Sequence, residues 1–256
     1  MNIAEARPAA TVILLREGPR GPEIFMVRRH HQIDFAGGAL VFPGGKVAPE
    51  DIRLAQAHVP DDPLGSFRLA AIRELFEETG LLLAESAAGT TGASAEPTDR
   101  LRTELVQAGI DFPTLLDRLG MRATPEVLLP FAHWITPEMV PKRFDTHFFL
   151  ARMSGEAILS HDGGETVDSL WITPREALSA GTEGRHTVIW PTRMNLQKLA
   201  QHETVEALWA ATEAAPVVTV LPRLVQTPQG QRMCIPEEAG YPEWEVDLAT
   251  LMGAAR

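Results

Sequence analysis

Three glutamates in the stretch from 73 to 81 have the residue type and the spacing to do chemistry. Glu74, Glu77 and Glu78 stand at i, i+3 and i+4, so in a helix that ends at Gly80 their carboxylates share one face. Like charges on adjacent turns repel and cost about a few tenths of a kcal/mol per pair. Bound Mg²⁺ or Mn²⁺, which prefer oxygen ligands, would offset that repulsion. Because short acidic patterns also occur on solvated helix faces, the glutamates alone leave both interpretations open.

A glycine pair upstream favours the metal-site interpretation. The apolar run 38–41 precedes Phe42-Pro43-Gly44-Gly45, which is typical of a strand that stops in a tight turn. Glycine lets the backbone approach a ligand closely and offer it an amide or a carbonyl. A strand, a glycine loop and a helix that carries Arg73 and the three glutamates together predict a site for metal ions and a diphosphate.

The segment resembles the Nudix box of the Nudix hydrolases: Gly, five residues, Glu, seven residues, Arg-Glu-apolar-x-Glu-Glu-x-Gly-apolar. Two features depart from it. Asp51 stands where the first glutamate is expected, although Glu50 precedes it, and 21 residues instead of seven separate Asp51 from Arg73. An insertion at this place is similar to that of the peroxisomal coenzyme A diphosphatase branch of the family. The matching residues are Gly45, Arg73, Glu74, Leu75, Glu77, Glu78, Gly80 and Leu81.

The resemblance implies which residues would carry the reaction. One to three Mg²⁺ or Mn²⁺ ions would be held by the box glutamates and the carbonyl of Gly45. Arg73 would pair with a box carboxylate and fix the helix against the glycine loop. A carboxylate on a downstream loop often joins the site in Nudix folds, and Glu165 is the candidate, with a plain turn acid as the alternative. The expected catalytic residues are Glu77, Glu78, Glu165 and Arg73, the proton acceptor staying open among the three glutamates, and the expected metal ligands are Gly45, Glu74, Glu77 and Glu78.

A basic cluster, Arg28-Arg29-His30-His31, precedes the glycine loop in an otherwise acidic chain. It is either a solvated strand end or a contact for substrate phosphates, and we expect Arg28 and Arg29 to bind substrate together with Gly44 and Gly45. Coenzyme A-specific Nudix enzymes carry an additional motif here. Arg29, Gly38 and Phe42 to Gly45 fit it, whereas Asp34 stands where a second arginine is expected.

Three functions follow from the resemblance. The first is hydrolysis of the diphosphate of a nucleoside diphosphate linked to another group, with coenzyme A or acyl-coenzyme A as substrate. The second is a Nudix hydrolase for ADP-ribose, NADH, dinucleoside polyphosphates or oxidised nucleotides, which Asp34 favours. The third is a non-catalytic Nudix-fold nucleotide-binding module. The third is the least favoured, because such modules usually lose box carboxylates and all three are present.

Composition limits the classes of partner. With 256 residues the chain can bury a large core, and its formal net charge of -11 disfavours binding to nucleic acid or to an anionic membrane. Bound metal can still reverse the local sign for a phosphate substrate. Cys234 is the only cysteine, so no intramolecular disulfide can form. The sequence shows no secretory signal, no membrane span and no C-terminal Ser-Lys-Leu, so we expect a cytoplasmic protein that acts on a small molecule, with a homodimer as one assembly that it allows.

The hydrophobic pattern and the resemblance predict one domain, residues 1–256, with an α/β fold: a Nudix-type α/β/α sandwich with a mixed sheet. Its core spans about 10–180, with insertions at about 52–63 and 84–125 and an extension at 181–256. We expect a helix to start near Asp62 and carry the box, and a flexible segment at 84–98. Strands are expected at 11–15, 23–27, 38–41, 128–135, 144–151 and 167–172, helices at 100–109, 113–120, 174–178 and 191–211, and a terminal hairpin at 216–225 and 232–235.

Four ring side chains in the expected strands are interpreted as parts of the core. Trp134 and Phe148 suit a core or a pocket wall better than a base-stacking platform. His133 and His147 are interpreted as satisfied, partly buried histidines rather than metal ligands, because neither has a partner at metal-ligand spacing.

Overall fold

The fold is known from a computed structural model, which describes residues 3–29, 38–86, 99–107, 109–153, 159 and 166–254. Its centre is an eight-stranded mixed sheet in the order β10-β7-β8-β1-β2-β3, in which β4 also pairs with β1 and β9 with β2. The β1–β8 and β10–β7 pairs are parallel and the others antiparallel. The strands are β1 (Ala6–Gly18), β2 (Gly21–Arg29), β3 (Leu40–Val41), β4 (Gly44–Lys46), β7 (Leu129–Ile135), β8 (Arg143–Arg152), β9 (Thr166–Ile172) and β10 (Thr219–Val220).

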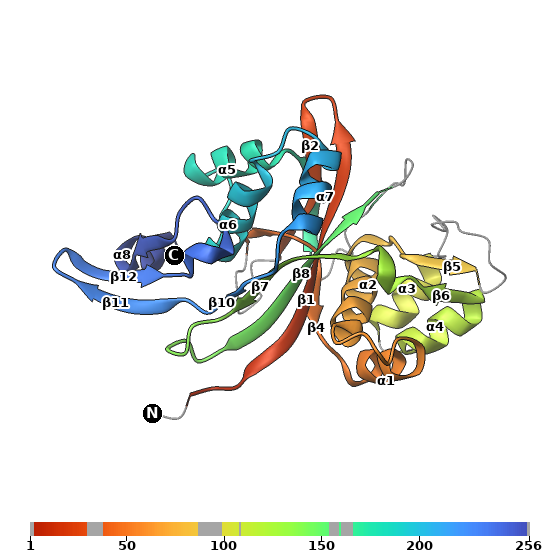
Figure 1. Ribbon diagram of the computed structural model, residues 1–256. Coiled ribbons are helices and arrows are strands. Elements are labelled where there is room, and N and C mark those ends of the chain that lie inside the picture. The colour runs from red at the N-terminus through yellow and green to blue at the C-terminus, as the bar shows by residue number, and fades with distance from the viewer. Residues whose placement is uncertain are drawn as a thin grey trace.

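Helices cover both faces of this sheet, as Figure 1 shows. Strand β1 explains why, because Val12 and Leu14 enter one core and Ile13 and Leu15 the other, as alternation along a doubly buried strand requires. The expected α/β/α sandwich is confirmed. The first core involves α1 (Pro49–His58), α2 (Gly65–Thr79), α3 (Asp99–Val106) and α4 (Phe112–Leu119), and the second involves α5 (Pro174–Thr182), α6 (Trp190–Leu199) and α7 (Val205–Ala214).

Smaller elements flank this framework. The insertion after α2 forms a two-stranded sheet as well as its helices, and the C-terminal part forms a three-stranded sheet that projects to one side (Figure 1). None of the helices in the described ranges is long and apolar enough to cross a membrane. The remaining elements are β5 (Ala84–Ser86), β6 (Met121–Ala123), β11 (Arg223–Thr227), β12 (Gly230–Cys234), β13 (Glu245–Asp247), α8 (Leu248–Ala254) and the 3-10 turns Pro125–Val127 and Glu237–Ala239.

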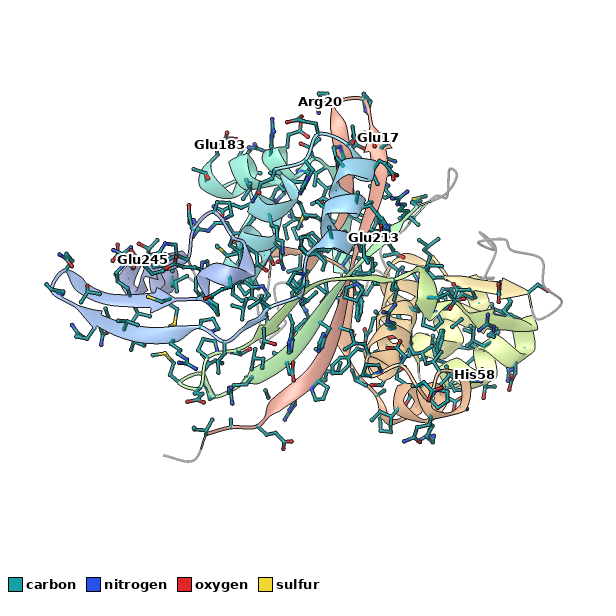
Figure 2. All side chains as sticks on the ribbon, in the orientation of Figure 1. Glu17, Arg20, His58, Glu183, Glu213 and Glu245 are labelled. Atoms are coloured by element: carbon teal, nitrogen blue, oxygen red, sulfur yellow. The ribbon has the colours of Figure 1, made fainter. Side chains whose placement is uncertain are left out.

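The prediction of one helix over 191–211 is wrong, because the chain forms α6 and α7 with a break at 200–204. Two side chains start the second helix. Thr204 accepts a hydrogen bond from the Ala207 amide at 3.1 Å, and Glu17 accepts one from the Val205 amide at 2.9 Å. Such acceptors satisfy the free amides of a helix N-terminus. Figure 2 shows Glu17 at the β1–β2 hairpin beside α7.

Two other boundaries differ from expectation. Helix α2 begins at Gly65 rather than near Asp62, whose carboxylate accepts the Leu64 amide at 2.9 Å in the turn before it. The first arm of the expected terminal hairpin is divided, because Thr219 and Val220 join the main sheet beside β7 and only β11 pairs with β12. Of the segment expected to be flexible, 84–86 form β5 and 87–98 lie outside the described residues.

A buried chain of hydrogen bonds attaches the C-terminal segment to the core. The Trp134 indole donates to the Tyr241 hydroxyl at 2.8 Å, and that hydroxyl donates to the Asn195 carbonyl oxygen at 2.9 Å. Trp134 and Asn195 are 4% and 0% exposed, so neither group can turn to water instead. Trp134 and Phe148 both lie in the core, as expected.

The substitution Tyr241→Phe keeps the ring and removes the hydroxyl that serves both partners. We expect it to destabilise the protein by about 1–3 kcal/mol, since a buried donor and a buried acceptor lose their bonds. Urea unfolding measures the loss. Trp244→Phe, at an aromatic side chain that is 42% exposed, is the control and should change stability little. Equal stability of Tyr241→Phe and wild type would show that the hydroxyl contributes nothing.

Candidate active site

The three predicted glutamates lie on α2, the helix between the glycine loop and the first core. Its sheet-facing side carries Leu75 and Phe76, which are fully buried, so packing fixes the rotation of the helix. The helix ends at Gly80, which has φ +78° and donates its amide to the Phe76 carbonyl. Glycine adopts this left-handed conformation without strain. Arg102, from α3, donates to the Glu77 carbonyl at 2.9 Å and so satisfies one of the free carbonyls at the helix end.

The Arg73 guanidinium is the centre of the site. Its Nε and Nη2 donate to the Asp51 carboxylate at 3.1 and 2.9 Å, and Nη2 also donates to the Lys46 carbonyl at 2.8 Å. Its Nη1 donates to Glu74 at 2.9 Å and to Glu77 at 3.1 Å. A guanidinium has five N–H groups, and these contacts use all five. One side chain therefore holds α1, α2 and β4 together.

Asp51 reaches Arg73 because the insertion folds as helix α1. Pro49 occupies the first turn, and Asp51 accepts the Ala48 amide at 2.8 Å. Asp51 is fully buried and the Arg73 side chain is 7% exposed. Burial raises the pKa of the Asp51 carboxyl, while Arg73 and the Ala48 amide lower it. Burial also opposes the charge of Arg73, but the hydrogen bond to Asp51 and the charges of Glu74, Asp51 and Glu77 raise the pKa of the guanidinium.

The glycine loop lies directly against the glutamates. The Gly44 amide donates to Glu78 Oε2 at 3.1 Å. A Cβ on Gly44 would lie 2.3 Å from the Ala10 carbonyl oxygen, and one on Gly45 would lie 2.4 Å from the carboxyl carbon of Glu74. A side chain at Gly44 would collide with the backbone of β1, whereas one at Gly45 would require the Glu74 carboxylate to move. Both glycines therefore lie very close to neighbouring groups of the protein, and their contact with a ligand stays a prediction.

Comparisons with known proteins agree with this geometry. A family model of the NUDT19 Nudix domain matches residues 50–199. The chain belongs to the Nudix hydrolase family. A Caenorhabditis elegans protein with a nudix hydrolase name is 29% identical over 195 residues, covering 76% of this chain and 61% of its own length. The Xenopus laevis protein named acyl-coenzyme A diphosphatase NUDT19 is 25% identical, covering 61% of this chain and 54% of its own length.

A crystal structure of a NUDIX hydrolase from Alicyclobacillus acidocaldarius has the same fold. It is 27% identical, superposes with a TM-score of 0.70, and the match covers 82% of this chain and 97% of that one. The family match and the relatives place the chain in the NUDT19 branch, as the inserted box suggested. The chain spans 61% and 54% of the two relatives described above.

The donor set fits the divalent ions that Nudix enzymes use. The Nudix-box carboxylates offer hard oxygen ligands beside a backbone that only glycine permits. Burial raises the pKa of Glu74 to about 7, with Glu77 adding to the rise and Arg73 opposing it. Because burial disfavours the charged form of Glu74, a bound cation would stabilise the carboxylate and lower that pKa. Among the described residues, the ligand oxygens of Glu74, Glu77 and Glu78 do not all lie within 4.8 Å of one another. The ligand atoms of His133, Asp145 and His147 do.

The other predicted site residues are placed less centrally. Arg28 and Arg29 end β2, the strand that pairs with β3 and so leads into the glycine loop. Arg28 forms an ion pair with Asp168 at 3.5 Å, and within the described ranges the Nε atoms of both arginines are buried with no hydrogen-bond partner. His30, His31, Asp34 and Glu165 lie outside the described residues.

Two features of the structure were not expected from the sequence. Asp51 had an uncertain role there, and its distance from Arg73 along the chain gave no sign of their contact. His133 and His147 are partly buried, as interpreted. The sequence spacing showed no metal-ligand partner for either residue, but the folded structure brings such partners close to both. Strand pairing brings them against each other and against Asp145.

The substitution Asp51→Asn removes the buried partner of Arg73 while keeping its shape. An amide presents N–H groups to a guanidinium that can only donate, so we expect a loss of about 3–5 kcal/mol in the free energy of unfolding. Urea unfolding measures it. Glu50→Gln, at the neighbouring partly exposed glutamate, is the matched control and should be near neutral. A larger loss of stability in Glu50→Gln than in Asp51→Asn would show that Glu50, and not Asp51, fills the first acidic position of the Nudix box.

The substitution Glu74→Gln tests the electrostatic cost of the site. Because the folded pKa of Glu74 is about 7, above its ordinary 4.5, the folded state holds more protons between these values and stability falls as pH rises through them. In the presence of a chelator, Glu74→Gln should be more stable than wild type near pH 8, by on the order of 1–3 kcal/mol. Near pH 4 the two proteins should have nearly equal stability. A pH-independent difference in urea unfolding would contradict this.

Proposed function

We propose that this chain is a metal-dependent Nudix diphosphatase that cleaves a nucleoside diphosphate linked to another group, with coenzyme A or acyl-coenzyme A as substrate. The observation that carries the proposal is the contact of α2 with the glycine loop. Glu78 accepts the Gly44 amide, Glu74 lies where a side chain on Gly45 would collide, and Arg73 fixes both elements. This arrangement places the carboxylates of α2 directly against the backbone of the glycine loop.

In this proposal the glutamates and the arginines have different roles. Glu74, Glu77 and Glu78, with the carbonyl of Gly45, would hold Mg²⁺ or Mn²⁺, which when bound would screen the diphosphate charge and stabilise the leaving phosphate. Arg73 keeps the carboxylates in place and does not reach outward, since its five donors are used. Arg28 and Arg29 would contact substrate phosphates, for which a guanidinium is well shaped.

The proton acceptor is one of three carboxylates. Glu77 is the most accessible of the described pair, with a side chain that is 24% exposed and one oxygen on Arg73. Glu78 is 7% exposed and accepts the Gly44 amide. A base must lie within hydrogen-bond reach of the attacking water, which favours Glu77 over Glu78. Glu165, which precedes β9 in the sequence and lies outside the described residues, would be the third candidate.

The substrate proposal rests on the branch of the family. Relatives in Xenopus, chicken and human carry the name acyl-coenzyme A diphosphatase NUDT19, and Gly38 and Phe42 to Gly45 fit the end of the coenzyme A motif. Asp34 favours the alternative, ADP-ribose, NADH or dinucleoside polyphosphates, because it reverses a charge in that motif.

The test is product analysis by mass spectrometry with Mg²⁺ or Mn²⁺ and a panel of coenzyme A, acetyl-coenzyme A, ADP-ribose, NADH, diadenosine polyphosphates and nucleoside triphosphates. We expect 3′,5′-ADP with phosphopantetheine or its acyl ester. AMP from ADP-ribose or NADH would overturn the coenzyme A assignment but keep the diphosphatase. Failure to cleave any of them would favour a nucleotide-binding module.

Glu77→Gln is expected to lower metal-dependent turnover by about 100-fold to 10,000-fold with the fold intact by circular dichroism. Glu213→Gln, on α7 across the sheet (Figure 2), is the matched control and should keep full activity. Wild-type turnover and unchanged Mg²⁺ dependence in Glu77→Gln would contradict the assignment of the site.

A further inference from the structure

A second group of ligand-type side chains lies on β7 and β8, away from the Nudix box. His133 and His147 are direct cross-strand partners, and Asp145 precedes His147 by two residues on the same face of β8. Phe67, near the start of α2, packs on His147 with ring centroids 4.4 Å apart, so the three side chains project from the face that α2 covers. All three are partly buried.

The three side chains already contact one another. His133 Nε2 lies 2.5 Å from Asp145 Oδ1, and the two imidazole rings stack at 3.9 Å between centroids with 11° between their planes. One ligand atom from each residue lies within 4.8 Å of the others. Because the residues sit on paired strands, the backbone fixes their spacing.

We propose that His133, Asp145 and His147 form a binding site for one transition-metal ion of the Zn²⁺ or Co²⁺ class, distinct from the Mg²⁺ or Mn²⁺ site of the Nudix box. Imidazole nitrogen suits Zn²⁺, Co²⁺ and Ni²⁺, whereas Mg²⁺ prefers a shell of oxygen atoms. Two histidines and one carboxylate supply the three protein ligands of an open zinc site, leaving a position for water or another ligand.

A fourth residue orients the first ligand. Thr219 Oγ1 on β10 lies 2.8 Å from His133 Nδ1 and Asp145 contacts Nε2, so an ion bound at Nε2 would replace the direct contact between His133 and Asp145. Histidine ligands in metal sites commonly make such a hydrogen bond through the other ring nitrogen, which sets the tautomer and the ring orientation. Thr219 thus has the place of an outer-shell partner on a third strand.

Modest adjustment suffices to bring the ligands around an ion. Metal–ligand distances of about 2.0–2.1 Å in a tetrahedron separate neighbouring ligand atoms by roughly 3.4 Å. The 2.5 Å contact between His133 and Asp145 would open slightly and the remaining separations would close. The lone pairs of stacked parallel rings lie in parallel planes, so one imidazole must also turn about its Cβ–Cγ bond.

The Nudix-box site and the histidine site lie on the same face of the sheet but have no ligand residue in common. Ala10 of β1 pairs with Gly45 of β4 on one side and with His147 of β8 on the other. Two strand spacings separate these backbones by roughly 10 Å. An ion on the histidines would therefore bind independently of the Nudix-box carboxylates, which allows each site to be tested with the other intact.

The experiment measures Zn²⁺ binding to the full chain by equilibrium dialysis and metal analysis, with excess Mg²⁺ present to occupy the Nudix box. We expect one Zn²⁺ per chain in wild type and in Glu74→Gln, and loss of that ion in His133→Gln, His147→Gln and Asp145→Asn. Thr219→Val should weaken binding by about 10- to 100-fold. Co²⁺ should give the visible absorption of a low-coordinate site in wild type and in Glu74→Gln, and not in the three ligand variants.

His58→Ala is the matched control, because His58 ends α1 on the surface (Figure 2), and it should bind Zn²⁺ like wild type. Circular dichroism checks that each variant is folded. Unchanged Zn²⁺ stoichiometry and affinity in the three folded ligand variants would overturn the proposal. Absence of Zn²⁺ from wild type, or its loss in Glu74→Gln with retention in His147→Gln, would overturn it as well.

Discussion

The geometry of the Nudix box depends on one buried cation. Arg73 donates to Asp51, to the Lys46 carbonyl and to two glutamates of its own helix, so α1, α2 and β4 meet at its guanidinium. Buried ion pairs add little net stability over an apolar core, but removing one partner is costly because the other charge remains without compensation. The value of Arg73 is therefore geometric. It fixes the glycine loop against α2 to within a hydrogen-bond length.

The single positive charge of Arg73 does not balance the negative charges around it. Three carboxylates, those of Asp51, Glu74 and Glu77, share a single arginine whose donors are already used. Burial raises the pKa of Glu74, and the charges of Glu77 and Asp51 add to the rise while Arg73 opposes it. Without an ion the fold bears the electrostatic cost of its own site, and a divalent cation would relieve it. This conflict between stability and activity is common where function requires like charges close together.

The sequence predicts the parts of this fold that depend on local pattern. The alternation in β1 and the glutamate spacing of α2 are local signals, and so is Gly80 at the helix end. The break between α6 and α7 has a local signal in the N-cap residue Thr204, but its second cap, Glu17, is 188 residues from Val205 in the chain and follows from no local pattern. The site divides in the same way. The residues of the Nudix box follow from their spacing, whereas the role of Asp51 needs the position of α1.

The histidine cluster shows why strand register limits such prediction. His133 and His147 face each other only because β7 is irregular between Pro130 and Ala132, where the pairing with β8 shifts. If the register of Leu129 continued without the shift, His133 would pair with Thr146 instead of His147 and would lie on the other face of the sheet. Pro130 is typical of such an irregularity, but it does not define the register that follows, and Thr219 comes from a strand far downstream.

The insertion in the Nudix box is compatible with the site because the inserted residues fold into a helix and a turn that bring the chain back to α2. The extra residues form α1 and a turn, and Asp62 accepts the Leu64 amide while pairing with Arg68 at 3.1 Å. Lengthening a loop adds little entropic cost, so the distance along the chain between Asp51 and Arg73 matters less than the position of the helix ends. Packing of α1 on α2 through Ala55 returns Asp51 to the guanidinium. The inserted helix thus supplies a partner to Arg73 as well as spacing, and this is why an aspartate, one methylene shorter than the expected glutamate, can serve at that position.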